Sequence, residues 1–95
     1  MPTARHLTII AYDQPDSRDR RRLAALLELH MIRVQDSVFE GWFTREEADH
    51  LAGLAHQIVG DSGSLRMYRV PRGAVPACRS WGFPPPPDQD GLLIV

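Results

Sequence analysis

The hydrophobic positions near the start of the chain form a short continuous run and then change to a helical spacing. The run at residues 7–11 is typical of a buried strand, which we expect to end at Asp13. Asp16 or Ser17 can cap a helix that begins after the break at Pro15. We expect this helix to extend to about His30, and its apolar face is carried by Leu23, Leu26 and Leu27.

The next segment, 32–39, alternates between apolar and polar positions and predicts a second strand. We expect a tight turn at Glu40 and Gly41, followed by a third strand that begins with "GWF" and completes a hairpin. One face of the second strand carries Ile32, Val34 and Val38, and the other carries Arg33, Gln35, Ser37 and Phe39.

A second helix and a fourth strand complete the pattern. Thr44 and Glu47 fit a capping box, and an apolar stripe continues through Leu51 to Ile58 until "GDSG" ends the helix. Residues 64–70 alternate and predict a strand. With right-handed crossovers, this order gives an α+β fold: a four-stranded antiparallel sheet with two helices on one face, the ferredoxin-like βαββαβ arrangement.

The pattern changes after Pro71, so we divide the chain into a core domain at residues 1–70 and a proline-containing extension at 71–95. "FPPPPDQD" is typical of a stiff extended spacer. The apolar "GLLIV" at 91–95 predicts an additional C-terminal strand that docks on a sheet edge or in a partner's groove. A frayed tail is the alternative.

Composition limits the class of protein. A chain of 95 residues with 43% hydrophobic positions fits one globular domain, and it has no apolar run of the roughly 20 residues that span a bilayer. We see no signal peptide and expect a cytoplasmic protein without membrane contact. The single Cys78 excludes an internal disulfide and a cysteine-based zinc site.

Charge is distributed unevenly along the chain. The net charge is −1, yet all eleven basic residues are arginine, and four of them lie between positions 18 and 22. Guanidinium groups bind phosphate in a bidentate manner, and a carboxylate at a strand end such as Asp13 can hold a metal ion. This combination favours nucleic-acid chemistry. The alternatives are an arginine bias from genome composition and an Asp13 that merely caps a loop or the following helix.

Three stretches carry a resemblance to a known family. "AYDQPDSRDRRRLAALL", "IRVQDSVFE" and "SLRMYRV" resemble the small CRISPR-associated protein that joins the CRISPR integrase in the spacer-acquisition complex. The resemblance covers about residues 7–70, and its second motif is the most specific. It departs from the family's pattern at Asp36, where many members carry an aromatic residue, and at Met31, which replaces a common glycine.

The resemblance implies a homodimer whose two sheets face each other and bring two copies of Asp13 to a shared cleft. It implies that Asp13 binds Mg²⁺ for phosphodiester cleavage of RNA or DNA. It also implies that the extended tail pairs with a strand of the integrase subunit. The positions that match family residues important for activity or phosphate contact are Arg20, Arg22, Arg33, Ser37 and Phe39.

Two functions therefore remain open from the sequence. In the first, the protein is a metal-dependent endonuclease in which arginines hold the scissile phosphate near Asp13. In the second, it is a non-catalytic bridge, a dimer that holds a short DNA duplex while its tails dock integrase dimers.

Overall fold

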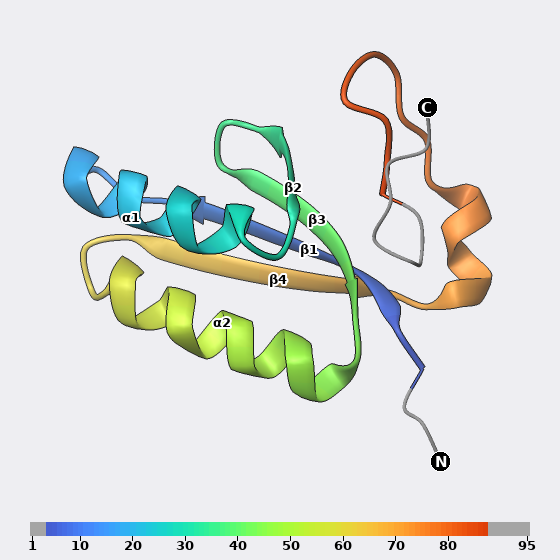
Figure 1. Ribbon diagram of the computed structural model, residues 1–95, viewed down its shortest axis with the longest axis horizontal. Coiled ribbons are helices and arrows are strands. Elements are labelled where there is room, and N and C mark those ends of the chain that lie inside the picture. The colour runs from blue at the N-terminus through green and yellow to red at the C-terminus, as the bar shows by residue number, and fades with distance from the viewer. Residues whose placement is uncertain (1–3, 88–95) are drawn as a thin grey trace.

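The computed structural model describes residues 4–87 and has the expected ferredoxin-like architecture. The sheet has the order β2-β3-β1-β4, and every pairing in it is antiparallel. Figure 1 shows both helices on one face of this sheet. The prediction of the fold is confirmed. The elements are β1 (His6–Asp13), α1 (Ser17–Glu28), β2 (Ile32–Gln35), β3 (Val38–Phe43), α2 (Arg45–Val59), β4 (Ser64–Val70) and the 3₁₀ helix η1 (Arg72–Ala77).

Both helices begin where the capping residues predict. The Asp16 side chain accepts a hydrogen bond from the Asp19 backbone N–H at 2.9 Å, which satisfies one of the unpaired donors at the start of α1. At α2, Thr44 and Glu47 form the complete capping box. The backbone hydrogen bond from Thr44 to the Glu47 carboxylate also lowers the pKa of that side chain.

The predicted position of the hairpin turn is wrong. The turn lies at Asp36 and Ser37, because Gln35 pairs with Val38, and the single strand expected at 32–39 is therefore two strands. Asp and Ser favour turns because their side chains bond the local backbone. Gly41 lies within β3, where a Cβ atom would stand 2.6 Å from a ring carbon of Phe43, so this glycine makes room for the ring.

The core lies between the sheet and the two helices. Ile10 and Phe39 project from the central strands and are completely buried, together with Leu23 and Leu27 of α1. Burial of large apolar side chains such as these is the main favourable contribution to folding. The cluster is completed by Tyr12, Ala24, Met31, Leu51, Ala55 and Val59.

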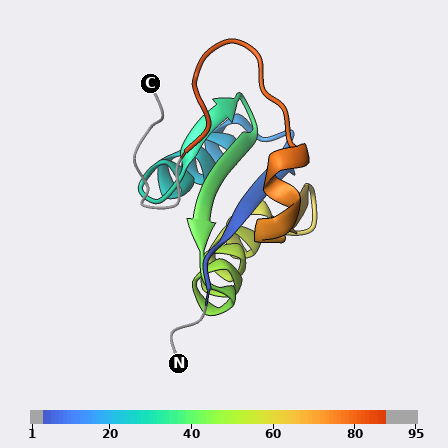
Figure 2. The same ribbon diagram turned by 90° about the vertical axis from the view of Figure 1, so that its right-hand side faces the viewer.

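The segment after β4 folds back over the opposite face of the sheet (Figure 2). The Trp42 indole N–H donates a hydrogen bond to the Pro87 carbonyl at 3.0 Å, and a hollow of about 460 Å³ lies between this segment and Leu7, Ile9 and Glu40. The expected C-terminal strand at 91–95 lies outside the described residues. None of the helices within 4–87 is long and apolar enough to cross a membrane.

Candidate functional site

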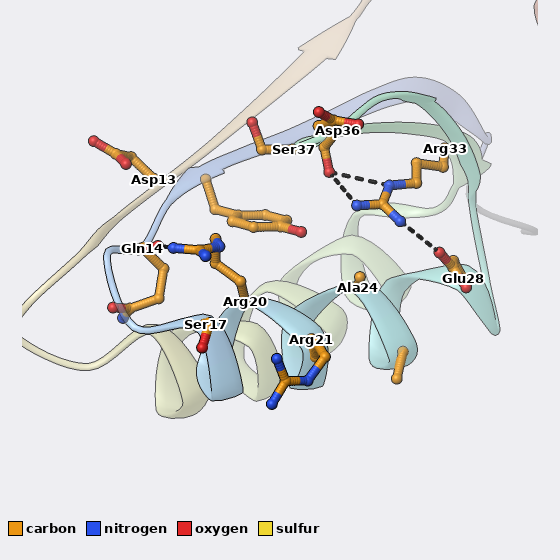
Figure 3. Close-up of a pocket in the computed structure, with 12 residues that line it drawn as sticks. Asp13, Gln14, Ser17, Arg20, Arg21, Ala24, Glu28, Arg33, Asp36 and Ser37 are labelled. Carbon is orange, nitrogen blue, oxygen red and sulfur yellow. Dashed lines mark hydrogen bonds and ion pairs between the residues drawn. The ribbon is translucent and has the colours of Figure 1, made fainter.

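An open hollow of about 600 Å³ lies where β1 ends, between α1 and the β2–β3 turn (Figure 3). Its lining residues lie within positions 12–37 and come from the end of β1, from α1, from β2 and from the β2–β3 turn. The residues that line it are Tyr12, Asp13, Gln14, Ser17, Arg20, Arg21, Ala24, Ala25, Glu28, Arg33, Asp36 and Ser37. The hollow is therefore a mixed site of arginines and carboxylates.

Asp13 is the last residue of β1 and is exposed at the rim of the hollow. It pairs with Ser64 of β4, and its side chain points away from Gln14 and Arg20 in Figure 3. Within residues 4–87 its carboxylate makes no hydrogen bond or ion pair. Both carboxylate oxygens are thus without a partner in the described part of the chain; the predicted metal role of Asp13 stays a prediction.

Gln14 fixes the backbone next to Asp13, a role that sequence analysis did not assign. Its side chain is 2% exposed and donates to the Val59 carbonyl at 2.7 Å, while its amide oxygen accepts from the Asp16 N–H at 3.0 Å. A Cβ atom at Gly63 would stand 2.5 Å from the Asp13 carbonyl oxygen. The end of β1 is therefore held against the C-terminus of α2. The sequence carries no signal for this role of Gln14, because the partner of its side chain is the Val59 carbonyl at the end of α2.

We expect Gln14→Leu to destabilise the protein by about 2–4 kcal/mol. Leucine leaves the Val59 carbonyl, whose bond to Gln14 is buried, and the partly buried Asp16 N–H without their partner, and a buried group left unsatisfied costs about 1–3 kcal/mol. Ser62→Ala is the matched control, because it removes only the long bonds of 3.3 and 3.4 Å to Gln14. Urea unfolding of both variants measures the difference. Equal stability of Gln14→Leu and wild type would contradict the anchoring role.

Of the predicted arginines, Arg20 bonds the backbone that directly follows Asp13. Its Nη1 donates to the carbonyls of Gln14 at 3.0 Å and Pro15 at 2.8 Å, so one nitrogen braces the β1–α1 loop. Within the described part of the chain its Nε and Nη2 make no hydrogen bond. Arg20 can therefore hold the loop and still contact an anion.

Arg33 has a structural role that its sequence position did not reveal. Its Nε and Nη2 donate to the Asp36 carbonyl at 3.0 and 2.7 Å, and its Nη1 bonds the Glu28 carboxylate at 3.2 Å (Figure 3). The guanidinium carbon lies 5.7 Å from the centre of the Phe39 ring. Arg33 thus joins the β2–β3 turn to the end of α1, and each of its nitrogens is already bonded.

The other predicted residues occupy three different environments. Ser37 lines the hollow, and its carbonyl accepts a hydrogen bond from the Tyr12 N–H at 3.1 Å. Phe39 is completely buried and stacks on Tyr12 with ring centres 6.2 Å apart, so it supports the floor of the site. Burial also raises the pKa of the Tyr12 phenol. Arg22 does not line the hollow and forms an ion pair with Asp19 at 3.1 Å.

The donor set for a metal ion is small. Residues 4–87 contain no group of three or more His, Cys, Asp or Glu side chains that could hold a cation. Of the three carboxylates in the hollow, Glu28 is bonded to Arg33, which leaves Asp13 and Asp36. Mg²⁺ retains several waters and often takes only one or two carboxylates together with substrate phosphates. One chain therefore fits part of a magnesium site.

Comparison with known proteins assigns the family. The model of the family described as CRISPR associated protein Cas2 matches residues 6–75. The chain belongs to the CRISPR-associated Cas2 family. The resemblance drawn from the sequence motifs is confirmed, and the match includes the whole sheet and both helices.

Relatives in the Cas2 family match most of the chain. It is 37% identical over 90 residues to "CRISPR-associated endoribonuclease Cas2 3" of Synechocystis sp., covering 94% of this chain and 98% of that protein. It is 45% identical to a Cas2 endoribonuclease of Thermus thermophilus over 77% of each chain. A chain in the solved "Partial Cas6-RT-Cas1--Cas2 complex" superposes with a TM-score of 0.66 at 26% identity, covering 94% of this chain and 90% of that one.

Proposed function

We propose that this protein is a Mg²⁺-dependent endonuclease of CRISPR adaptation that works as a homodimer. It cleaves phosphodiester bonds of RNA or DNA and bridges integrase dimers on the incoming spacer duplex. Two Cas2 relatives are named endoribonucleases, which supports nuclease activity in this chain. One structural neighbour is a chain of a solved complex that contains Cas1 and Cas2, which supports an integrase partner.

The observation that carries the nuclease proposal is the position of Asp13. Its carboxylate is exposed and unpaired within the described residues, on a backbone that Gln14, Gly63 and Arg20 hold in place. A fixed backbone with a free carboxylate is pre-organised for a cation, because binding requires little further ordering of the chain. Arg20 bonds the carbonyls of Gln14 and Pro15, which follow Asp13 in the chain, and its Nε and Nη2 make no hydrogen bond within the described residues, so they can donate to a phosphate.

The proposed metal site is shared between two chains. Asp13 of each protomer supplies a hard oxygen ligand, and waters and substrate phosphates complete the shell. When bound, Mg²⁺ would neutralise phosphate charge and lower the pKa of a coordinated water. The residues of this chain do the remaining work: Arg20 holds a phosphate oxygen, and Arg33 keeps the β2–β3 turn against α1 so that the hollow stays open.

A non-catalytic scaffold is the second candidate, and one observation favours it. Of the carboxylates that line the hollow, only Asp13 and Asp36 are not bonded to an arginine. Two carboxylates make a weak cation site in an isolated chain, and residues 4–87 contain no larger group of possible ligands. In this case the arginines of α1 hold a DNA duplex, and the tail beyond residue 87 docks the integrase. Arg18, Arg21 and Arg22 are exposed on α1 and suit backbone contacts of this kind.

A cleavage assay with controlled metal separates the two candidates. We expect labelled single-stranded RNA or DNA, or a duplex, to be cut in Mg²⁺, left intact in EDTA, and cut again when Mg²⁺ is restored. Cleavage that persists in EDTA would contradict metal dependence. No cleavage at any Mg²⁺ concentration, by a dimer that binds a DNA duplex and the cognate integrase, would establish the scaffold in place of the nuclease.

A further inference from the structure

The hollow beside α1 is lined by as many acidic as basic side chains. Three cations and three anions line it: Arg20, Arg21 and Arg33, and Asp13, Glu28 and Asp36. A nucleic acid is attracted to a protein by positive charge, because its phosphates are anions that release counterions on binding. The hollow by itself therefore offers a phosphate little net attraction, and binding there depends on which of its arginines can be released from an acid.

Glu28 and Arg33 form an ion pair in this hollow, and we call them the Glu28–Arg33 pair. The Arg33 Nη1 lies 3.2 Å from the Glu28 carboxylate, whereas Nε and Nη2 of the same guanidinium donate to the Asp36 carbonyl at 3.0 and 2.7 Å (Figure 3). Nη1 thus bonds a side chain, and the other two nitrogens hold the backbone of the β2–β3 turn. A ligand that replaced the Glu28 carboxylate would leave the bonds to the turn intact.

The Glu28–Arg33 pair is exposed enough for a ligand to compete with it. The exposed fraction of the side chain is 43% for Arg33 and 50% for Glu28. An exposed ion pair contributes little free energy, because water and salt screen its charges. A guanidinium binds carboxylate and phosphate oxygens through the same fork of donors. The Glu28 carboxylate therefore occupies a place that a phosphate oxygen can take at small cost.

The pair lies on the side of the sheet that carries the helices. Arg33 is paired in register with Phe39, and its guanidinium lies 5.7 Å from the centre of that ring, which belongs to the core beneath α1. Glu28 is the last residue of α1 itself. The proposed dimer brings together the opposite faces of two sheets, so it leaves the Glu28–Arg33 pair accessible to a ligand.

We propose that Glu28 is a built-in competitor of nucleic-acid phosphates: a backbone phosphate that enters the hollow must displace the Glu28 carboxylate before it can contact Arg33. The inference rests on the proposed function, because it concerns the phosphates that the nuclease or the scaffold would hold. It makes Glu28 a residue that sets affinity, although Glu28 itself touches no substrate. Arg20 makes the first contact, since its Nε and Nη2 have no hydrogen bond within the described residues.

The affinity for a labelled blunt DNA duplex, measured in EDTA, tests the competition. Glu28→Gln removes the competing charge and keeps the size of the side chain, so its Kd should fall by about 2- to 5-fold, the range that an exposed ion pair can supply. Asp36→Asn is the matched control, because it removes one charge from the same hollow and its carboxylate bonds no arginine within the described residues. A Glu28→Gln protein that binds no more tightly than Asp36→Asn would overturn the proposal.

A double-mutant cycle shows whether the effect of Glu28 passes through Arg33. Side chains in contact give a coupling free energy in such a cycle, whereas independent sites add. The gain from Glu28→Gln should therefore disappear in an Arg33→Gln background, and any gain from Asp36→Asn should persist there. If Glu28→Gln tightens binding equally in both backgrounds, Glu28 acts only as a negative charge and the proposal fails.

The salt dependence of binding is a second measurement that leaves Arg33 unchanged. Each phosphate contact to a duplex contributes about 0.9 to the slope of log Kd against log salt. A guanidinium released from its acid should add one such contact, so the slope for Glu28→Gln should rise by about 0.9. The slope for Asp36→Asn should stay near that of wild type. An unchanged slope for Glu28→Gln would contradict the release of Arg33.

Stability and cleavage keep this inference apart from the other roles of the residues. Glu28→Gln should remain dimeric and unfold at the wild-type urea concentration, because the pair is exposed. A lower midpoint together with weaker binding would give the pair a structural role instead. The binding experiments contain EDTA, so the competition can be observed even if the protein never cuts, and then only the nuclease proposal fails. Mg²⁺-dependent cleavage with no effect of Glu28→Gln on binding would sink the competition alone.

Discussion

Replacing Asp13 with asparagine should reduce Mg²⁺-dependent cleavage by about a thousandfold or more. The change keeps the shape of the side chain but removes the anionic oxygens that would bind Mg²⁺, and a metal ion supplies several kcal/mol of charge stabilisation in the transition state. Asp13 is exposed and its carboxylate has no partner within residues 4–87, so the free energy of unfolding should change by less than about 0.5 kcal/mol. Cleavage kinetics and urea unfolding on the same preparation separate the two effects.

Asp36→Asn is the matched control for this experiment. Asp36 lines the same hollow, and its carbonyl rather than its carboxylate accepts the bonds from Arg33. The substitution therefore removes one negative charge from the hollow and preserves the turn. The proposed metal site takes Asp13 of each protomer and not Asp36, so we expect Asp36→Asn to keep most of the cleavage rate, and a loss as large as that of Asp13→Asn would add Asp36 to the metal ligands. Normal cleavage by Asp13→Asn would end the nuclease assignment of Asp13.

The sequence predicted those parts of the fold that depend on local chemistry. Asp16 and Thr44 begin their helices through bonds to residues three positions ahead, and such bonds are visible in the spacing alone. The end of β1 at Asp13 was predicted equally well. The hairpin turn was misplaced because Val38 and Phe39 were assigned to the same alternating strand as residues 32–35, whereas the turn at Asp36 and Ser37 interrupts it. A glycine at position 41 then suggested a turn, although its actual role is to admit the Phe43 ring.

The candidate site was predicted less completely, because its contacts join distant segments. Gln14 meets Val59 across 45 positions, and no local pattern indicates that pairing. The role of Arg33 depends on the turn that the sequence misplaced, since its bonds go to the Asp36 carbonyl. Sequence spacing thus identifies residues that belong to the site, whereas the bonding state of each guanidinium shows which arginines can accept a ligand.

Replacing Phe39 with alanine should destabilise the protein by about 3–5 kcal/mol, the largest change in stability that we expect for a residue of the site. The ring is completely buried, stacks on Tyr12 and lies beneath the Arg33 guanidinium. Its loss leaves a cavity under both side chains. The free energy of unfolding in urea measures the effect, with a small domain expected to lose a large part of its total stability.

Phe39→Leu distinguishes a packing role from direct participation in chemistry. Leucine fills much of the cavity, so this variant should recover a large part of the stability lost in Phe39→Ala, and cleavage should recover in proportion. A Phe39→Leu protein that is stable, dimeric and able to bind nucleic acid but does not cut would contradict the packing role. Since the ring is 0% exposed, its effect on the site must pass through Tyr12 and Arg33, which form the floor and one wall of the hollow.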